Sequence, residues 1–135
     1  MQSSILRDLI EQELLQVHTG FFGRIISVKE NLATVQPLDM IKEVGGQPVQ
    51  QAVIENCPIM RNVKKFEKKR VETSAGGEYG HHHTMEIWDI QDLSAGDIVY
   101  CACADRDISE TRNGAMAAPA PGHHMLSSAV IVGVL

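Results

Sequence analysis

The first hydrophobic residues of the chain repeat at intervals of three and four positions. This spacing places them along one side of an α-helix, and charged and amide side chains fill the other side. The sequence therefore predicts an amphipathic N-terminal helix within residues 1–19, which starts after Ser3 or Ser4, reaches about Val17 and ends at Thr19-Gly20. The stripe would pack against the protein's own β structure, the arrangement that we favour, or against a partner. Its members are Ile5, Leu6, Leu9, Ile10, Leu14 and Val17.

From residue 20 onward the period of the pattern changes to two, which indicates β-strands. A hairpin is expected first, with strands at residues 22–28 and 32–38 joined by a tight turn. Pro37 has no N–H donor, so it should lie at the end of its strand or on a sheet edge. The remaining strands are expected at residues 40–44 as an extension of the second strand, at 51–60 with a break at 56–58, and at 84–90, 98–104 and 126–135.

Five or six alternating strands with frequent turn signals predict a mainly-β fold, a small antiparallel barrel. A first hairpin, a long excursion and a terminal strand suit a five-stranded OB-type barrel over residues 20–135. One part of this range differs in character. Residues 61–70 hold six of the twelve basic residues, and a glycine-rich stretch and three histidines follow. We expect a flexible insertion at about residues 61–83.

Composition narrows the possible partners. The 135 residues fit one domain, the net charge is −5, and only 4% of the residues are aromatic. An acidic chain has little non-specific affinity for nucleic acid or for an anionic membrane. A module that binds single strands also needs aromatic side chains for bases to stack on, and the candidates are only Phe66, Tyr79, Trp88 and Tyr100. No apolar run approaches the roughly 20 residues of a membrane helix. We therefore expect no nucleic-acid partner and no stable membrane anchoring.

The histidines are the candidate metal ligands. Alternate residues of an extended segment share a face, so His81 and His83 could bind one metal ion, and His123 and His124 could complete the set if the two loops meet. The simpler interpretation is a pair of solvent-exposed loops, and we expect no metal and no cofactor. A small metal-binding protein that uses the His81–His83 cluster remains an alternative.

The other reactive residues favour structural roles. Asp105-Arg106-Asp107 with Ser109 is most simply an ion-paired hairpin, because general acid–base work needs a cleft and shifted pKa values. Cys57, Cys101 and Cys103 show no metal-ligand spacing and fit small buried apolar positions. No catalytic motif is present in the sequence, so we expect no enzymatic activity.

Several short segments together resemble the N-terminal OB-fold domain of central spike proteins, the puncturing proteins in the baseplates of contractile tails of phages and tailocins. The segments occur in the family's order across residues 20–135. They are FFGRIISVKENLATVQPL at residues 21–38, Glu55-Asn56-Cys57-Pro58-Ile59, Ala95-Gly96-Asp97-Ile98-Val99, Asp105-Arg106-Asp107-Ile108 and His124-Met125-Leu126-Ser127-Ser128-Ala129-Val130.

The resemblance implies a structural protein of the virion or tailocin particle, assembled in the bacterial cytoplasm and placed at the tail tip. It implies a homotrimer whose OB domains ring the tail axis and contact hub, tube and spike proteins. In such an assembly the apolar stripe of the N-terminal helix would dock on the hub or on an adjacent subunit. The alternative from another class is an OB-fold module that binds nucleic acid.

Overall fold

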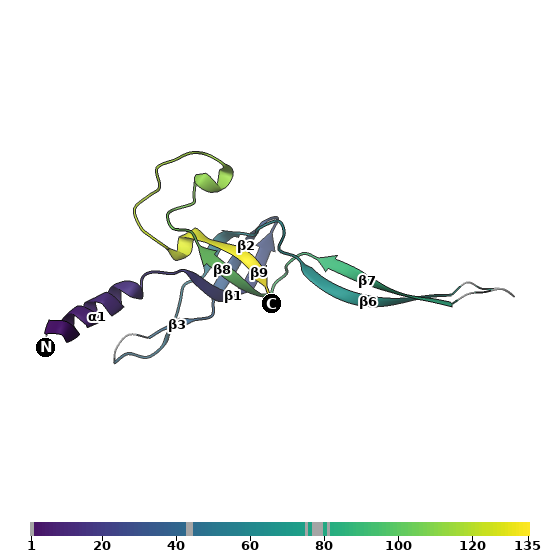
Figure 1. The fold of residues 1–135 in the computed structure, drawn as a ribbon, viewed down its shortest axis with the longest axis horizontal. Coiled ribbons are helices and arrows are strands. Elements are labelled where there is room, and N and C mark those ends of the chain that lie inside the picture. The colour runs from purple at the N-terminus through teal and green to yellow at the C-terminus, as the bar shows by residue number, and fades with distance from the viewer. Residues whose placement is uncertain (1, 43–44, 75, 77–79, 81) are drawn as a thin grey trace.

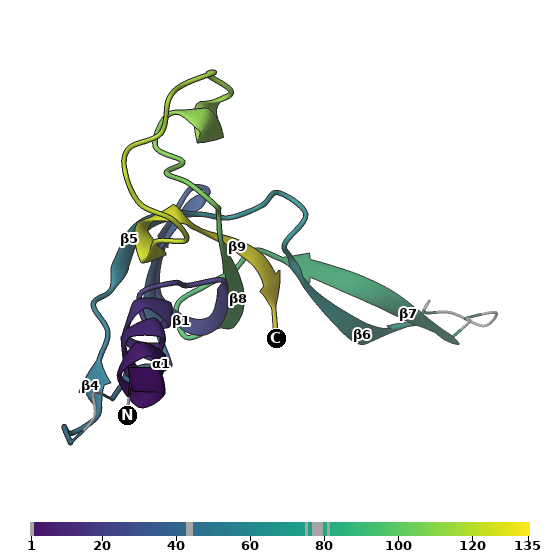
Figure 2. The same cartoon turned by 60° about the vertical axis from the view of Figure 1, so that its left-hand side comes forward.

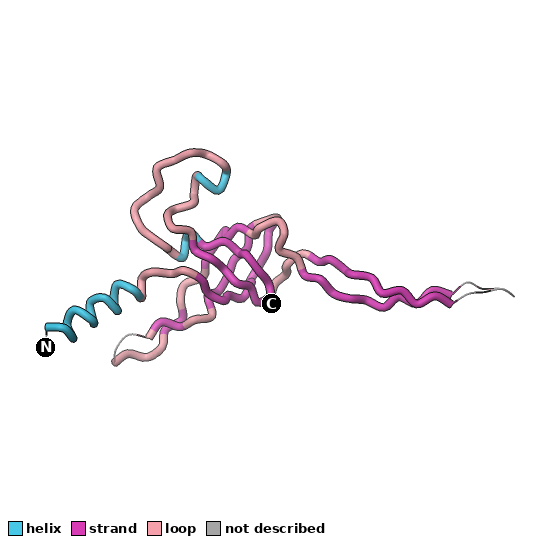
Figure 3. Tube along the Cα trace, in the orientation of Figure 1, coloured by secondary structure: helices cyan, strands magenta, loops and turns pink. Residues whose placement is uncertain are grey.

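A computed structural model of the chain describes residues 2–42, 45–74, 76, 80 and 82–135. A curled β-sheet forms its centre, a helix projects from one side, and a long two-stranded arm projects from the opposite side (Figure 1). Most of the regular structure is β, as the secondary-structure colouring in Figure 3 shows. The elements in chain order are α1 (Gln2–Leu14), β1 (Gly20–Lys29), β2 (Leu32–Pro37), β3 (Met40–Ile41), β4 (Val49–Gln50), β5 (Ile54–Pro58), β6 (Lys65–Ser74), β7 (His82–Gln91), β8 (Ile98–Cys103), the 3₁₀ turns η1 (Thr111–Asn113) and η2 (Leu126–Ser128), and β9 (Ala129–Val134).

The central sheet is a half-barrel of five antiparallel strands in the order β5-β2-β1-β8-β9. Its two outer strands approach each other, because Ile59, which follows β5, forms a parallel bridge with Ile131 of β9. The next residue reinforces this contact: the Met60 N–H donates to the Ile131 carbonyl at 3.1 Å. Figure 2 shows the curl of the strands from the side. The predicted mainly-β fold with an N-terminal helix is confirmed, and the half-barrel is compatible with an OB-like fold.

Alternate residues of the five strands point into the half-barrel and form its core. In β1 the buried positions are Phe21, Gly23 and Ile25, and in β2 they are Ala33, Val35 and Pro37. This period-two burial is what a sheet with one covered face requires. The buried apolar residues of the core are Phe21, Ile25, Ala33, Val35, Ile54, Cys57, Val63, Leu93, Val99, Cys101, Cys103, Ala129 and Ile131.

Gly23 gives this core a first stability prediction. A Cβ atom at Gly23 would lie 2.3 Å from Cγ1 of Val35, a side chain with no exposed surface. Gly23→Ala should therefore lower the free energy of unfolding by about 1–3 kcal/mol, the usual range for overpacking. Gly133→Ala is the matched control, because a Cβ at this strand glycine meets no atom within 4 Å. Urea unfolding of both variants checks the prediction, which fails if the two lose the same stability.

The N-terminal helix is shorter than the apolar pattern predicted. It ends at Leu14 rather than at about Val17, and the N–H groups of Gln16 and Val17 bond three residues back, to the carbonyls of Glu13 and Leu14. Gly20 does not end the helix but starts β1, where a Cβ would lie only 1.9 Å from the Tyr100 hydroxyl oxygen. Gly20 leaves room for the end of the Tyr100 side chain of β8, and the sequence pattern does not distinguish that role from a helix stop.

The predicted strands are mostly confirmed in the half-barrel. Strands at 22–28 and 32–38 appear as β1 and β2 with Pro37 at the end of its strand, and strand 98–104 appears as β8. The predicted break at 56–58 is wrong, because β5 runs through it. Asn56 takes a left-handed φ of 54°, which asparagine tolerates better than most residues, and the pairing with β2 shifts register between Ala33 and Val35.

Three further expectations need correction, and part of the expected insertion is regular structure. Residues 40–41 do not extend β2 but pair with residues 49–50 in a small separate sheet, and residues 126–128 form η2 ahead of β9. The strand expected at 84–90 is present as β7, yet it pairs with β6 rather than with the half-barrel. Residues 65–74, which we expected within a flexible insertion, are the strand β6. Cross-strand pairing of side chains of opposite charge favours this hairpin.

Candidate interaction surfaces

The apolar stripe of α1 is exposed. Its side chains keep between 42% of their surface, at Val17, and 62%, at Ile5. Leu9, Ile10, Leu14 and Val17 line a shallow hollow on the helix together with Glu13. The favoured expectation, that this stripe packs on the protein's own β structure, is wrong: the core of the half-barrel is filled by its own strands and the segments that join them, and the helix projects away from it (Figure 1).

The second exposed apolar surface lies on the arm formed by β6 and β7. Residues directly opposite each other in an antiparallel pair share a face, so the pairs Phe66–Ile90 and Lys68–Trp88 lie on the same face of the arm. Phe66, Trp88 and Ile90 are each at least 60% exposed. We call these three residues the arm patch. These large apolar side chains face outward rather than into the core of the half-barrel.

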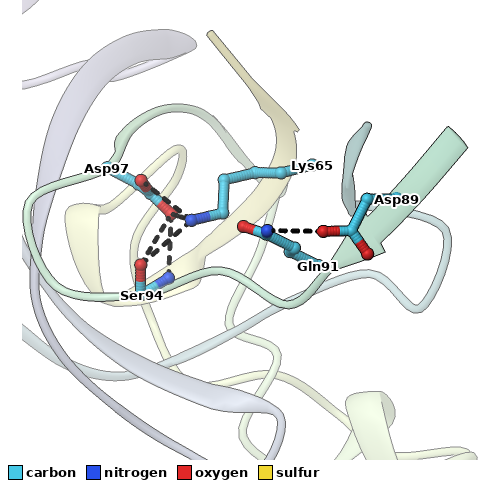
Figure 4. A network of polar contacts seen from close by, with 5 residues as sticks. All are labelled: Lys65, Asp89, Gln91, Ser94 and Asp97. Carbon is cyan, nitrogen blue, oxygen red and sulfur yellow. Dashed lines mark hydrogen bonds and ion pairs between the residues drawn. The ribbon is translucent and has the colours of Figure 1, made fainter. Parts of the chain in front are cut away.

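A network of polar contacts fixes the base of the arm to the turn before β8 (Figure 4). Lys65 of β6 lies 3.0 Å from Oδ2 of Asp97 and also donates to the Ser94 hydroxyl at 3.0 Å. The Ser94 N–H donates to the same carboxylate at 2.8 Å, and the Asp97 carbonyl accepts a hydrogen bond from the Ile25 N–H of β1. Asp97 thus connects the arm, the turn and the half-barrel.

This network stabilises the ionised form of the Asp97 carboxyl group. Partial burial opposes ionisation, but the hydrogen bonds from Ser94 and the positive charge of Lys65 outweigh it and hold the pKa of Asp97 below its ordinary value of 3.8. A carboxyl group with a lowered pKa in the folded state stabilises the fold at pH values above its ordinary pKa. This stabilisation is lost as the pH falls through the pKa of the folded state.

Asp97→Asn should therefore lower the free energy of unfolding at pH 7 by about 1–2 kcal/mol, because Lys65 loses its negatively charged partner and the Ser94 N–H loses a charged acceptor. The difference from the wild type should shrink as the pH falls below 3.8, where the wild-type carboxyl also becomes neutral. Urea unfolding at pH 3, 5 and 7 measures both effects. A difference that stays constant over this range would show that the charge of Asp97 contributes nothing.

Ion pairs continue along the arm. Lys68 lies 2.5 Å from Glu86, Lys69 lies 2.7 Å from Asp89, and Lys64 pairs with Asp92 just outside the two strands. The hydrogen bond with Lys69 holds the pKa of Asp89 below its ordinary value, and the same contact raises the pKa of Lys69. Residues 65–70 of the basic run, which we expected in an insertion, lie in one strand of a charge-paired ribbon.

The histidines of the metal alternative lie in different parts of the molecule. His83 is in β7, one pair from the last pair of the arm, whereas His123 and His124 precede η2, and the His124 N–H bonds the carbonyl of Asp105 just after β8. His81 lies outside the described residues. His124 Nε2 is 3.4 Å from Asp105, and His123 Nδ1 is 3.9 Å from it. Within the described ranges, no three side chains of His, Cys, Asp or Glu are arranged to hold a metal ion.

The segment after β8 is not the ion-paired hairpin that the sequence predicted. Asp105 faces the two histidines, and the Asp107 carboxylate accepts a hydrogen bond from the Ser109 hydroxyl at 2.6 Å. This hydrogen bond is the main cause that lowers the pKa of Asp107, with backbone N–H groups adding to it. A hollow of about 230 Å³ lies beside Asp107 and Ser109. The segment is an irregular loop that its own side chains and backbone stabilise.

The three cysteines occupy the small buried positions that the sequence predicted. The Cys57 thiol donates to the Ala129 carbonyl at 3.3 Å. A hydrogen bond with Cys101 holds the pKa of Cys57 below its ordinary value, while the same bond and burial raise the pKa of Cys101. Burial raises the pKa of Cys103 to about 11. These thiols are part of the core of the half-barrel.

The aromatic residues that a nucleic-acid module would use do not form one platform. Phe66 and Trp88 lie on the arm, whereas Tyr100 is in β8 and packs edge-on against Phe22 with ring centroids 5.2 Å apart. Tyr79 lies outside the described residues.

Sequence reasoning missed the arm as a surface. Its signal in the sequence was weak, because residues 66–72 contain only two apolar side chains, Phe66 and Val71, and do not alternate as a half-buried strand does.

Comparison with known proteins gives no family assignment. No protein-family model matches the sequence, and no curated protein matches it. Over the described residues, the structure has no helix of the length and apolarity needed to cross a membrane.

Proposed function

We propose that this protein is a structural component of a contractile tail of a phage or tailocin, in which three copies form a ring of OB-like domains in the central spike or hub. It acts by assembly rather than by catalysis. Its partners are copies of itself and the hub, tube and spike proteins of the tail tip. The particle forms in the cytoplasm of the bacterial host.

The observation that carries the proposal is where the resembling segments lie in the half-barrel. FFGRIISVKENLATVQPL covers β1 and β2, Glu55-Asn56-Cys57-Pro58-Ile59 covers most of β5, the Gly96-Asp97 turn enters β8, and the last segment runs into β9. The five strands of the half-barrel therefore carry the pattern in order, which supports an OB-like domain of the spike type. The arm lies between β5 and β8, as an addition to this domain.

The two exposed apolar surfaces support a role in assembly. The stripe of α1 and the arm patch project from opposite sides of the half-barrel (Figure 1), and large exposed apolar surfaces are typical of protein–protein contacts. A ring of identical subunits needs two different surfaces on each subunit, one for each neighbour. In this chain, the stripe of α1 and the arm patch are the candidates for these two contact surfaces.

The mass of the full chain in solution tests the proposal. Sedimentation equilibrium at micromolar concentration should give three times the chain mass of 14.8 kDa. Electron microscopy of purified tails should then place the protein at the tail tip. A monomer that shifts single-stranded DNA at low salt, and is missing from tail tips, would replace the proposal with the nucleic-acid module.

A further inference from the structure

We propose that the β6–β7 arm pairs edge to edge with the arm of a second copy of this chain, so that β6 of one copy lies beside β7 of the next. The inference rests on the proposed function only for the number of copies, because the trimer sets how many arms are present. Edge pairing itself requires nothing more than a neighbouring copy.

The arm has two open edges. Its strands pair over ten residues each, from Lys65–Gln91 to Ser74–His82, and form a two-stranded sheet that no third strand of the described chain joins. A strand with an unpaired edge presents a row of N–H and C=O groups that can accept another strand. A two-stranded ribbon is only marginally stable by itself, whereas three or more strands with an apolar face are stable. Pairing with a further strand would therefore stabilise the arm.

The charges of the two edges identify the second copy as the partner. The strand β6 has four basic and two acidic side chains, a net charge of +2, and β7 has two acidic side chains and a net charge of −2 with its histidines neutral. A β6 edge therefore attracts a β7 edge, while two β6 edges or two β7 edges repel each other. The complementary edge that each strand needs is present on every other copy of the chain.

The geometry of the hairpin suits a ring. Because β6 and β7 run antiparallel within one copy, arms related by rotation place β6 antiparallel to the β7 of the neighbour. Such a contact is heterologous, so it closes when the rotation closes and continues into a filament when it does not. With three copies the result is a six-stranded collar in which strands of opposite charge alternate. The arm patches of the three copies then lie on one face of a continuous sheet.

A charge-swapped chain tests edge pairing while keeping the ion pairs within each arm. The variant combines Lys68→Glu, Lys69→Glu, Glu86→Lys and Asp89→Lys, which reverses both partners of the Lys68–Glu86 and Lys69–Asp89 pairs. The net charge of β6 becomes −2 and that of β7 becomes +2. Swapped chains can still pair with one another, but a mixed edge between swapped and wild-type chains brings like charges together.

Native mass spectrometry measures how many oligomers contain both wild-type and swapped chains. Equal amounts of wild-type and swapped chains, one of them isotope-labelled, are allowed to exchange. Random mixing of trimers would make about three quarters of them mixed. We expect the mixed fraction to fall about tenfold or more below the random value, while each chain alone forms oligomers of its usual size.

The outcomes separate this inference from the proposed function. Trimers that mix at random would overturn edge pairing and leave the trimer intact. Segregated oligomers of another size would support edge pairing and overturn the trimer. Monomers in every sample would overturn both.

A measurement on the wild-type chain covers the case in which the swapped chain does not fold. Hydrogen exchange of the β6 and β7 amides should slow about tenfold or more between dilute and concentrated protein, because pairing protects the outer N–H groups. Exchange in the arm that does not change with concentration, in a sample that forms oligomers, would overturn the inference.

Discussion

Replacing Leu9 with aspartate is expected to weaken the association of this protein by about 30-fold or more while the half-barrel stays folded. Leu9 lies near the middle of the apolar stripe of α1 and keeps 55% of its surface exposed in the single chain. A charge at the centre of an apolar contact would have to lose its water without gaining a partner. The core of the half-barrel does not include this side chain, so its stability should be unaffected.

Two measurements show which partner the stripe contacts. If α1 docks on an adjacent copy, the Leu9→Asp variant should have a lower mass by sedimentation equilibrium. If α1 docks on the hub, the mass should stay that of the wild type, and the variant should fail to enter tail particles. Gln12→Asp is the matched control, because it adds one negative charge outside the stripe. A Leu9→Asp variant that keeps the wild-type mass and enters tail particles would remove the stripe from the assembly contacts.

Replacing Ile131 with alanine is expected to lower the free energy of unfolding by about 3–5 kcal/mol. Ile131 has no exposed surface, and its backbone takes part in the parallel bridge to Ile59 and in the hydrogen bond from Met60. Truncation removes apolar contacts and leaves a cavity where β9 approaches β5. Because the whole stability of a domain is typically about 5–15 kcal/mol, this is a large fraction of it.

Ile26→Ala is the matched control for this prediction. Ile26 is also a strand isoleucine, but 48% of its side chain is exposed, so its truncation should cost less than about 1 kcal/mol. Urea unfolding followed by circular dichroism measures both variants. Equal small losses would mean that Ile131 does not contribute to a packed core.

Alternation of apolar and polar residues was enough to predict the half-barrel. In β1, Phe21 and Ile25 point inward, and the hairpin with β2 follows from this pattern and from the turn between them. The pattern failed at Asn56, because a residue in the left-handed conformation can bend a strand without ending it. It also failed at Gly20, which starts a strand and leaves room for Tyr100, about eighty positions away in the chain.

The two exposed surfaces could be predicted only in part. A stripe such as that of Leu9 and Ile10 shows which side of a helix is apolar, but it contains no information on what covers that side. In the arm, the basic run that includes Lys68 and Lys69 suggested an insertion without regular structure when it was considered alone. These lysines form ion pairs with Glu86 and Asp89, which follow about twenty residues later and become neighbours only through strand pairing.

The parallel contact between Ile59 and Ile131 has a consequence for the order of folding during synthesis. The hairpin of β1 and β2 depends on short-range contacts and can begin to form soon after its residues leave the ribosome, since local structure forms in microseconds. The half-barrel has to wait for β9, so Ile25 and Val99 stay accessible to solvent and to chaperones until translation has passed residue 134. A ribosome that stalls before that point would hold a chain whose central sheet still exposes its apolar face to other proteins.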